Sequence, residues 1–521
     1  MNDTKNFLFV TLTFILTYLE VKGQTKVIVV GGGLSGVTAA RNLVNKNYDV
    51  TVLEARSRPG GRIWTYDLYD SSVDLGCGFI FPGANDFFNK TIDFRLSLNN
   101  VTILNCEVRD ATTDLKETAT FVQSVLLAMV NLQKVHSTFD ATLSISEALR
   151  DSRVEEELKN RGGSAWTVGK HIMEVLMGGD FDKMSIKTQI PSDELQKVIH
   201  VIKDGMQTFI ESMIMGKTGE DEVKIMYNSP VTKIVQRDTR IEVTSNGIIY
   251  TAAHVVVAVP AAVLKAKKIQ FVPALGPARL TALARVGVGV VNKLVLEFDA
   301  VFWGTGPVHF VGFLPEESDN TSSLIYWLNY HHVTKKPVLV GFLTGQESIN
   351  SETMSAEAVR DKGLAVLRKM FGEAKVNART VVTYYSTRWG SDEFSLGSHV
   401  FRTPDMTSFD FEELAKSRGK LHFAGDYTFL EDRGVGTITG AYYSGRVVVQ
   451  NILYLDDFVT PSTEDPSTPT TTLSAFTTPT DGPRPVVTEN SSKSSTSAAN
   501  MNRIELILLL YFMLMNLCIV L

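Results

Sequence analysis

Three glycines and one acidic residue near the start of the sequence have the spacing of a dinucleotide-binding site. Gly31, Gly33 and Gly36 belong to the run Gly-Gly-Gly-Leu-Ser-Gly, which also contains Ser35. In a turn between a strand and a helix, the first glycine permits a tight bend and the second lets the backbone approach a pyrophosphate. The third lets the helix and the strand pack closely, while the helix N-terminus favours the phosphate charge. Glu54 follows Gly36 by 18 residues, where an acid can bind ribose hydroxyls.

A strand, a helix and a second strand must follow in that order to position these residues. Residues 26–30 are an almost continuous apolar run, residues 37–43 have a helical composition, and the apolar run 50–53 ends at Glu54. A lone glycine pattern would be weak support, but the complete series makes a chance match a poor explanation. The sequence therefore predicts an α/β fold with a parallel sheet of the Rossmann type.

The segment after the second strand is more particular. It reads Glu54-Ala55-Arg56-Ser57-Arg58-Pro59-Gly60-Gly61-Arg62, and by itself it could be an exposed basic loop. Flavin-containing amine oxidases, which include polyamine oxidases, monoamine oxidases and histone lysine demethylases, continue their second strand in this way. The chain resembles this family here, and the resemblance continues through the segments 73–80, 204–206, 229–234, 254–260, 423–428 and 434–441.

The resemblance implies the amine oxidase fold, in which a Rossmann-type FAD-binding domain is interleaved with an α+β substrate-binding domain. It implies FAD rather than a nicotinamide cofactor, because the matching segments come from the beginning, middle and end of the chain. Arg62 would lie along the FAD phosphates and flavin, Val231 would contact the adenine, and Asp426 stands where most members have Glu. No metal site is expected. The expected cofactor-binding residues are Gly31, Gly33, Ser35, Gly36, Glu54, Ala55, Arg56, Arg62, Gly78, Phe79, Val231, Trp389, Gly425, Asp426, Thr437 and Ile438.

Lys293 and Trp389 are the catalytic candidates. From spacing alone, Lys293 could lie with Glu297 on a solvated face of the strand 292–298. In polyamine oxidases and histone lysine demethylases, however, a lysine at the matching place holds a water against the flavin N5, and the segment matching Trp389 lines the substrate side. Ser398 replaces the cysteine through which monoamine oxidases attach FAD, so we expect non-covalent FAD.

Three residues are candidates for the substrate pocket: Phe81, His399 and Thr437. Amine-oxidising relatives often present an aromatic pair where this chain has His399 and Thr437, and animal polyamine oxidases tend to have His where Phe81 stands. The reaction implied is hydride transfer from the carbon beside an amine nitrogen to the flavin. The imine then hydrolyses to an aldehyde, and oxygen reoxidises the flavin to give hydrogen peroxide. A polyamine-like substrate is favoured.

Two other functions stay open. An L-amino-acid oxidase would share the fold, but the arginine expected to bind a substrate carboxylate is absent from residues 79–83. The other is a flavin-binding surface scaffold without turnover, because a fold does not by itself establish an activity.

Composition limits the partners and the compartment. The chain has 521 residues, 44% of them hydrophobic, and a net charge of −6. The sequence contains no basic run, which disfavours nucleic acid as a partner. Cys77 and Cys106 could form one disulfide or remain two free thiols, and a disulfide framework is excluded. The oligomeric state stays open.

Both ends of the sequence indicate the secretory pathway. The apolar stretch 7–19 followed by small residues predicts a signal peptide. The four Asn-X-Ser/Thr sequons that follow it, at Asn89, Asn100, Asn320 and Asn490, agree with that route. Residues 459–500 are rich in Ser, Thr and Pro, which predicts a disordered stalk. A small polar spacer and a terminal apolar tail favour a glycolipid (GPI) anchor on the extracellular face of the plasma membrane; a single transmembrane helix or secretion are the alternatives.

The expected organisation has eight parts. They are the signal peptide (1–23), FAD-binding segments (24–83, 201–265 and 401–454), a mostly helical substrate-domain segment (84–200), the substrate-domain sheet with the flavin-facing segment (266–400), the stalk (459–500) and the tail (504–521).

Overall fold

The computed structural model describes residues 24–68, 72–81, 86–102, 105–109, 142–188, 198–304, 306–315, 323–429 and 434–458. The expected signal peptide, stalk and terminal tail lie outside these residues. By contacts, the chain divides into a unit of residues 1–452 and a second unit of residues 453–521, of which only the end of one helix is described. Every sheet of the described residues belongs to the first unit.

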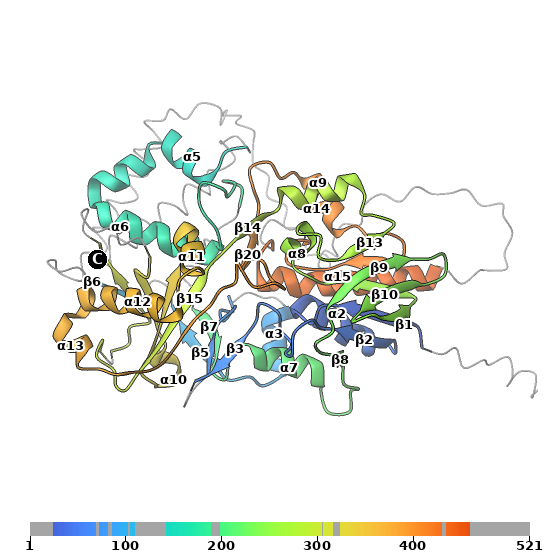
Figure 1. Ribbon diagram of the computed structural model, residues 1–521, viewed down its shortest axis with the longest axis horizontal. Coiled ribbons are helices and arrows are strands. Elements are labelled where there is room, and N and C mark those ends of the chain that lie inside the picture. Colours follow the sequence, from blue (N-terminus) through green and yellow to red (C-terminus); the bar gives the residue numbers. More distant parts are fainter. Residues whose placement is uncertain are drawn as a thin grey trace, which may run out of the picture. The chain divides into compact units, whose positions relative to one another are not determined.

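A five-stranded parallel sheet carries the glycine turn (Figure 1). Strand β1 (Lys26–Val30) pairs with β2 (Asp49–Leu53) on one side and with β12 (His254–Val257) on the other. Strands β8 (Lys224–Met226) and β21 (Leu421–Phe423) complete the order β21-β12-β1-β2-β8. The side chains of β12 are all buried, as expected for a parallel strand covered on both faces. The predicted α/β class with a parallel sheet is therefore confirmed.

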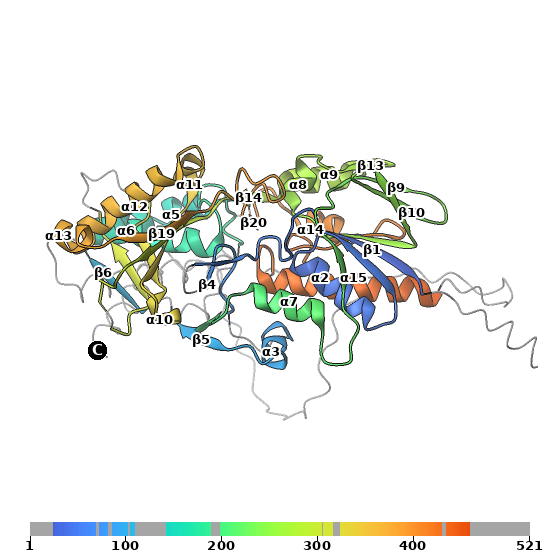
Figure 2. The ribbon, with the colours of Figure 1, turned by 60° about the horizontal axis from the view of Figure 1, so that its bottom comes forward.

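Two helices from opposite ends of the sequence pack beside this sheet (Figure 2). Helix α2 (Leu34–Val44) contacts β1, β2 and β12, and buries Ala39 and Ala40 completely. Helix α15 (Ile438–Phe458) crosses α2 so closely that a Cβ on Gly445 would collide with the carbonyl oxygen of Ser35. Helix α7 (Gln207–Met215) also contacts α2.

A second group of strands shares a core with the parallel sheet. The four-stranded sheet has the order β11-β10-β9-β13, and its buried side chains, such as Ile234 and Val243, cluster with Ile28 and Val255. Its elements and neighbouring helices are β9 (Val231–Gln236), β10 (Ile241–Ser245), β11 (Ile248–Ala252), β13 (Gln270–Val272), α8 (Ala261–Lys265), α9 (Pro277–Arg285) and α14 (Ser408–Ala415).

A six-stranded mixed sheet of order β19-β15-β18-β17-β16-β6 forms the centre of a separate core. Its strands are β6 (Cys106–Arg109), β15 (Asn292–Phe298), β16 (Phe310–Phe313), β17 (Tyr326–Asn329), β18 (Val338–Leu343) and β19 (Val381–Ser386). Side chains from α5 (Ile145–Asp151), α6 (Val154–Met177) and α12 (Ala356–Phe371) complete this core. The remaining elements are β3 (Thr65–Asp67), β4 (Ser72–Asp74), α3 (Asp86–Asp93), β5 (Leu98–Val101), β7 (Ile199–Ile202), β14 (Gly287–Gly289), α10 (His331–Thr334), α11 (Gly345–Ser351), α13 (Glu373–Asn377) and β20 (His399–Phe401).

The segment 84–200 contains strands that its helical spacing did not predict. Its described part includes α3, α5 and the 24-residue α6, but also β5, β6 and β7. Strand β5 pairs with β7, and β6 joins the edge of the six-stranded sheet beside β16. These short strands owe their conformation to distant partners, which a local pattern cannot reveal. Residues 110–141 of this segment lie outside the described residues.

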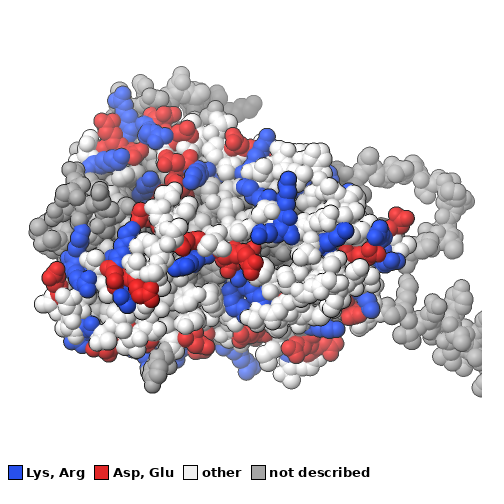
Figure 3. Space-filling view, in the orientation of Figure 1, with Lys and Arg blue, Asp and Glu red and all other residues white. Residues whose placement is uncertain are grey.

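Charged side chains are interspersed on the face shown in Figure 3, where Lys and Arg alternate with Asp and Glu. None of the helices in the described ranges is both long and apolar enough to cross a membrane.

Candidate active site

The glycine turn joins β1 to α2 through three glycines with different environments. Gly31 has φ 103°, and a Cβ there would lie 2.7 Å from the carbonyl oxygen of Ala258. A Cβ on Gly36 would collide with the carbonyl oxygen of Gly31, so this residue permits helix and turn to touch. A Cβ on Gly33, in contrast, would have no neighbour nearer than 4.0 Å. The bare backbone of Gly33 therefore leaves space for a ligand instead of relieving a packing clash.

The N-terminus of α2 faces the same space. Gly33 is its N-cap residue, and no side chain caps the helix. Gly33, Leu34 and Ser35 all line the cavity described below. The first amides of a helix carry a partial positive charge, so this end is suited to an anion such as a pyrophosphate.

Glu54 holds the turn in place from the end of β2. Its Oε2 accepts a hydrogen bond from Gly32 N–H (2.6 Å), and its Oε1 accepts one from Arg56 N–H (2.8 Å). Glu54 is 5% exposed, and this burial raises the pKa of its carboxyl group despite the two hydrogen bonds. Each carboxylate oxygen can accept further bonds, so both remain available to ribose hydroxyls.

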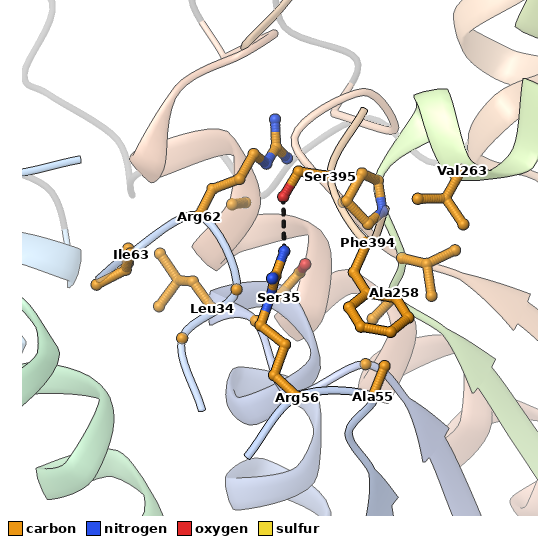
Figure 4. A pocket seen from close by; sticks show the side chains of 18 of the residues that line it. Leu34, Ser35, Ala55, Arg56, Arg62, Ile63, Ala258, Val263, Phe394 and Ser395 are labelled. Carbon is orange, nitrogen blue, oxygen red and sulfur yellow. Dashed lines mark hydrogen bonds between the residues drawn. The ribbon is translucent and has the colours of Figure 1, made fainter. Parts of the chain in front are cut away.

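One cavity of about 540 Å³ brings most of the predicted site residues together. Figure 4 shows part of its lining, including Ser35, Ala55, Arg56 and Arg62. The predicted residues in its lining are Gly31, Gly33, Ser35, Glu54, Ala55, Arg56, Arg62, Val231, Lys293, Trp389, His399, Gly425, Asp426, Thr437 and Ile438. Gly36, Gly78, Phe79 and Phe81 are absent from it. Gly36 lies behind the turn, Gly78 packs against Asp74, and both phenylalanines pack against the core of the six-stranded sheet.

Two arginines of the cavity pair with distant carboxylates. Arg56 binds Asp392 through both terminal nitrogens (2.8 and 2.5 Å) and also reaches Ser395 Oγ (2.9 Å; Figure 4). Arg62 Nη2 donates to Asp426 Oδ1 (2.7 Å), and this carboxylate raises the pKa of the arginine in spite of burial. These pairs join the beginning of the chain to its last 130 residues across the cavity wall.

Lys293 lines the same cavity as the acidic residue Glu54. Its ammonium donates to the carbonyl oxygens of Asp74 (2.7 Å) and Gly76 (2.6 Å), and burial lowers its pKa. The solvated strand face considered for Lys293 and Glu297 is wrong, because Glu297 is only 4% exposed and strand β15 is covered on both faces.

The cavity lining near Lys293 also includes Trp389, Ser398 and His399. Trp389 is buried, and its indole N–H donates to the carbonyl oxygen of Leu75 (3.3 Å). Ser398 Oγ accepts from Val291 N–H (2.7 Å) and lies 3.0 Å from His399 Nδ1. Burial, reinforced by nearby Arg62, lowers the pKa of His399 to about 4, so its imidazole is neutral at pH 7. We call Lys293, Trp389 and His399 the reactive face.

Several lining residues were not predicted. Gly60 and Gly61 belong to the quoted Arg-Pro-Gly-Gly-Arg run, so the sequence contained a signal for them. Cys77 lies in the lining as an exposed free thiol, and Cys106 is also free, which answers the open question of a disulfide between them. Phe394 and Ser395 line the cavity near Arg56, and no local pattern pointed to them.

A parallel sheet, a glycine turn and an uncapped helix N-terminus in the lining of one cavity are the features of a dinucleotide-binding protein of the α/β class. The open space at Gly33, the uncapped α2 and the acid Glu54 fit the pyrophosphate and ribose of such a cofactor. Lys293, Trp389 and His399 line this same cavity.

Comparison with known proteins places the chain in one family. Residues 34–453 match the family model for flavin-containing amine oxidoreductases. Polyamine oxidase 4 of Oryza sativa subsp. japonica is 30% identical over 447 residues, covering 80% of this chain and 86% of that protein. Lysine-specific histone demethylase 1 homolog 2 of Arabidopsis thaliana is 28% identical over 469 residues, covering 86% and 61%. A putrescine oxidase redesigned for cofactor binding has the same fold, with a TM-score of 0.66, 18% identity and coverage of 83% and 99%.

The chain therefore belongs to the flavin-containing amine oxidoreductase family. It is a FAD-dependent oxidoreductase that acts on amines, and the expected family, fold and cofactor are confirmed.

Proposed function

We propose that this chain is a secreted or cell-surface amine oxidase that oxidises a polyamine-like amine with oxygen and releases hydrogen peroxide. The observation that carries the proposal is Lys293, whose ammonium is buried at the reactive face. The chemistry that FAD supplies when bound is acceptance of a hydride from the carbon beside the amine nitrogen, with transfer of the electrons to oxygen. The resulting substrate imine hydrolyses to an aldehyde and a smaller amine.

Lys293 would hold and orient a water beside the reacting atoms. Two of its three N–H donors bind the carbonyls of Asp74 and Gly76, so one donor remains for a water. The surrounding burial that lowers the pKa of Lys293 also disfavours a charged substrate nitrogen. The reactive face thus favours the neutral amine, which is the form that can lose a hydride.

A polyamine-like substrate is supported by the names of several relatives, whereas an amino acid is disfavoured by the cavity. A substrate carboxylate would need a free arginine. Among the described residues of the lining, both arginines, Arg56 and Arg62, are already paired with carboxylates. Turnover of a panel of polyamines, monoamines and L-amino acids, with hydrogen peroxide and aldehyde measured, tests the assignment. Activity on L-amino acids alone, or on nothing, would refute it.

FAD is held non-covalently in this proposal, because the cysteine of monoamine oxidases is replaced by Ser398, whose hydroxyl is bound to Val291 N–H. The purified protein should be yellow and should release intact FAD into solution on denaturation. Yellow colour that stays with the precipitated protein would contradict this.

The secretory route rests on the sequence: the apolar segment 7–19, the Ser/Thr/Pro-rich segment 459–500 and the apolar tail. With a glycolipid anchor, phosphatidylinositol-specific phospholipase should release the enzyme from intact cells. Retention on the membrane, with residues 506–521 still present in the mature protein, would favour a transmembrane helix instead.

A further inference from the structure

Glu352 joins three segments of the chain behind the reactive face. It follows α11 as the C-cap residue and does not line the cavity. Its Oε1 accepts hydrogen bonds from Asn292 Nδ2 (2.7 Å) and from Gly390 N–H (2.7 Å). Its Oε2 accepts a third from Ser391 N–H (2.6 Å). One carboxylate therefore fixes the start of β15 and the turn that follows Trp389.

Asn292 extends this connection to Trp389 itself. The side chain is fully buried, and its Oδ1 accepts from Trp389 N–H (2.9 Å) and from Thr387 Oγ1 (3.0 Å). The backbone amides of three consecutive residues, 389 to 391, are thus all held by Asn292 and Glu352. The bonds accepted by Asn292 Oδ1 are buried, and buried hydrogen-bond networks whose members are satisfied specify one arrangement of the chain.

The front of the same network reaches the cavity. Trp389 donates to the carbonyl oxygen of Leu75, and Lys293, which follows Asn292 on β15, donates to the carbonyls of the residues on either side of Leu75. The two catalytic candidates therefore hold one short segment between them. A shift of the 389–391 turn would move Trp389 against this segment and disturb the position of Lys293.

The fit around Glu352 is close. A Cβ on Gly390 would lie 2.9 Å from Glu352 Oε1, so a larger residue at position 390 would push the carboxylate away from the turn. Three N–H donors meet two anionic oxygens, and charge-assisted bonds of this kind are the strong ones. A neutral amide at position 352 would offer one acceptor oxygen and would face at least one N–H with an N–H of its own.

We infer that Glu352 is a positioning residue for amine oxidation, acting through Asn292 and the turn to hold Trp389 and Lys293 in place. The inference rests on the proposed function for its kinetic consequence. Its structural consequence, a fixed Trp389 beside the cofactor, does not depend on any substrate.

The variants E352Q and E352A test this, with E347Q as the matched control. Glu347 lies in α11, which Glu352 follows, and it also accepts side-chain hydrogen bonds, but from Lys362 and Asn350 and not from the 389–391 turn. We expect the rate of flavin reduction by amine to fall about ten-fold in E352Q and more in E352A, because small misplacements of catalytic groups are costly. The Michaelis constant should change less, since Glu352 does not line the cavity.

Two further measurements do not need turnover. Trp389 packs edge-on against Trp64 with ring centroids 6.2 Å apart, so the near-ultraviolet circular dichroism of the apoprotein should change in both Glu352 variants. The dissociation constant for FAD should rise by about three-fold or more, because Trp389 lines the cofactor cavity. E347Q should match the unmutated protein in all three measurements.

If folded E352Q and E352A keep the dichroism, the FAD affinity and the reduction rate of the unmutated protein, the inference is wrong. If E352A does not fold, E352Q decides the outcome by the same measurements. If the unmutated protein oxidises no amine, the proposed function fails, while the dichroism and FAD affinity still decide the position of Trp389.

Discussion

Two regions of the cofactor cavity lining differ in the kind of protein group that forms them. Around the N-terminus of α2 the lining is mainly backbone, with Gly31 and Gly33 held by strand and helix geometry. The reactive face is made of side chains, Lys293, Trp389 and His399, which come from two distant parts of the chain. The region around the glycine turn requires residues without a Cβ, because a Cβ would fill the space at Gly33 or distort the turn at Gly31. The second depends on groups that are present and correctly oriented.

This difference separates binding from rate. Changes at the glycine turn should impair FAD binding and folding together, because the turn is part of the central sheet. Changes at the reactive face should weaken FAD binding much less and should mainly alter the rate of the chemistry.

The largest effect is expected for Gly31→Ala. Gly31 has φ 103°, and its new Cβ would lie 2.7 Å from a backbone oxygen that belongs to the neighbouring strand connection. We expect the free energy of unfolding to fall by about 3 kcal/mol, with loss of FAD binding, measured by chemical denaturation and FAD titration. Gly276→Ala is the control, since φ is −63° there and nothing lies within 4 Å. If Gly31→Ala binds FAD as the unmutated protein does, the expectation that FAD binding requires a glycine at position 31 is wrong.

An intermediate effect is expected for Lys293→Met, which removes the ammonium but keeps an apolar stem of similar length. FAD binding should persist, while flavin reduction or reoxidation slows by about ten-fold or more, equivalent to ~1.4 kcal/mol in a barrier. Stopped-flow absorbance of the two half-reactions shows which step is affected.

Lys265→Met is a matched control for this substitution. Lys265 also donates to two backbone carbonyls, those of Ala284 and Val286, but it lies outside the cavity lining. If both half-reactions of Lys293→Met equal those of the control while an amine is turned over, the water-holding role is wrong.

The last prediction concerns the loss of folding stability at acid pH. Burial lowers the pKa of His399 to about 4 from an ordinary 6.5, so the unfolded chain takes up this proton first as pH falls. The folded state therefore loses stability progressively as pH falls from about 6.5 towards 4. His399→Gln should remove that part of the acid sensitivity, as seen in denaturation curves of the apoprotein at pH 7 and pH 5.

Glu54, near the glycine turn, contributes a pH dependence of stability that has the opposite sign to that of His399. Burial raises the pKa of Glu54, so the folded state binds that proton more readily and gains stability as pH falls through the raised value. If His399→Gln has the same pH dependence of stability as the unmutated protein, His399 does not contribute to the acid sensitivity.

The glycine end could be predicted because its residues are close in sequence. The turn, α2 and Glu54 all lie within residues 26–54, and their spacing follows from one strand-helix-strand unit. The resemblance then supplied the distant cofactor segments, such as the one containing Asp426. Local spacing alone could not show that Asp426 pairs with Arg62, because 364 residues separate them.

The reactive face was harder to predict because its order arises from tertiary contacts. The sequence marked Lys293 and Trp389, but not Asn292 or Glu352, whose roles come from hydrogen bonds to backbone amides across the fold. Phe79 and Phe81 lie next to a recognised motif, yet they pack into the core of the six-stranded sheet. Strands β5, β6 and β7 are short and depend on partners far along the chain.

The strand order β21-β12-β1-β2-β8 also has a consequence for biosynthesis. The first strand made, β1, must wait for β12 about 230 residues later, and the outer edge of β12 stays unpaired until β21 has left the ribosome. Only then can Asp426 meet Arg62 and the N-terminus of α15 reach the cavity. The nascent chain therefore exposes an apolar strand edge through most of translation, and the lining of the cofactor cavity is complete only after β21 and the start of α15 have been made.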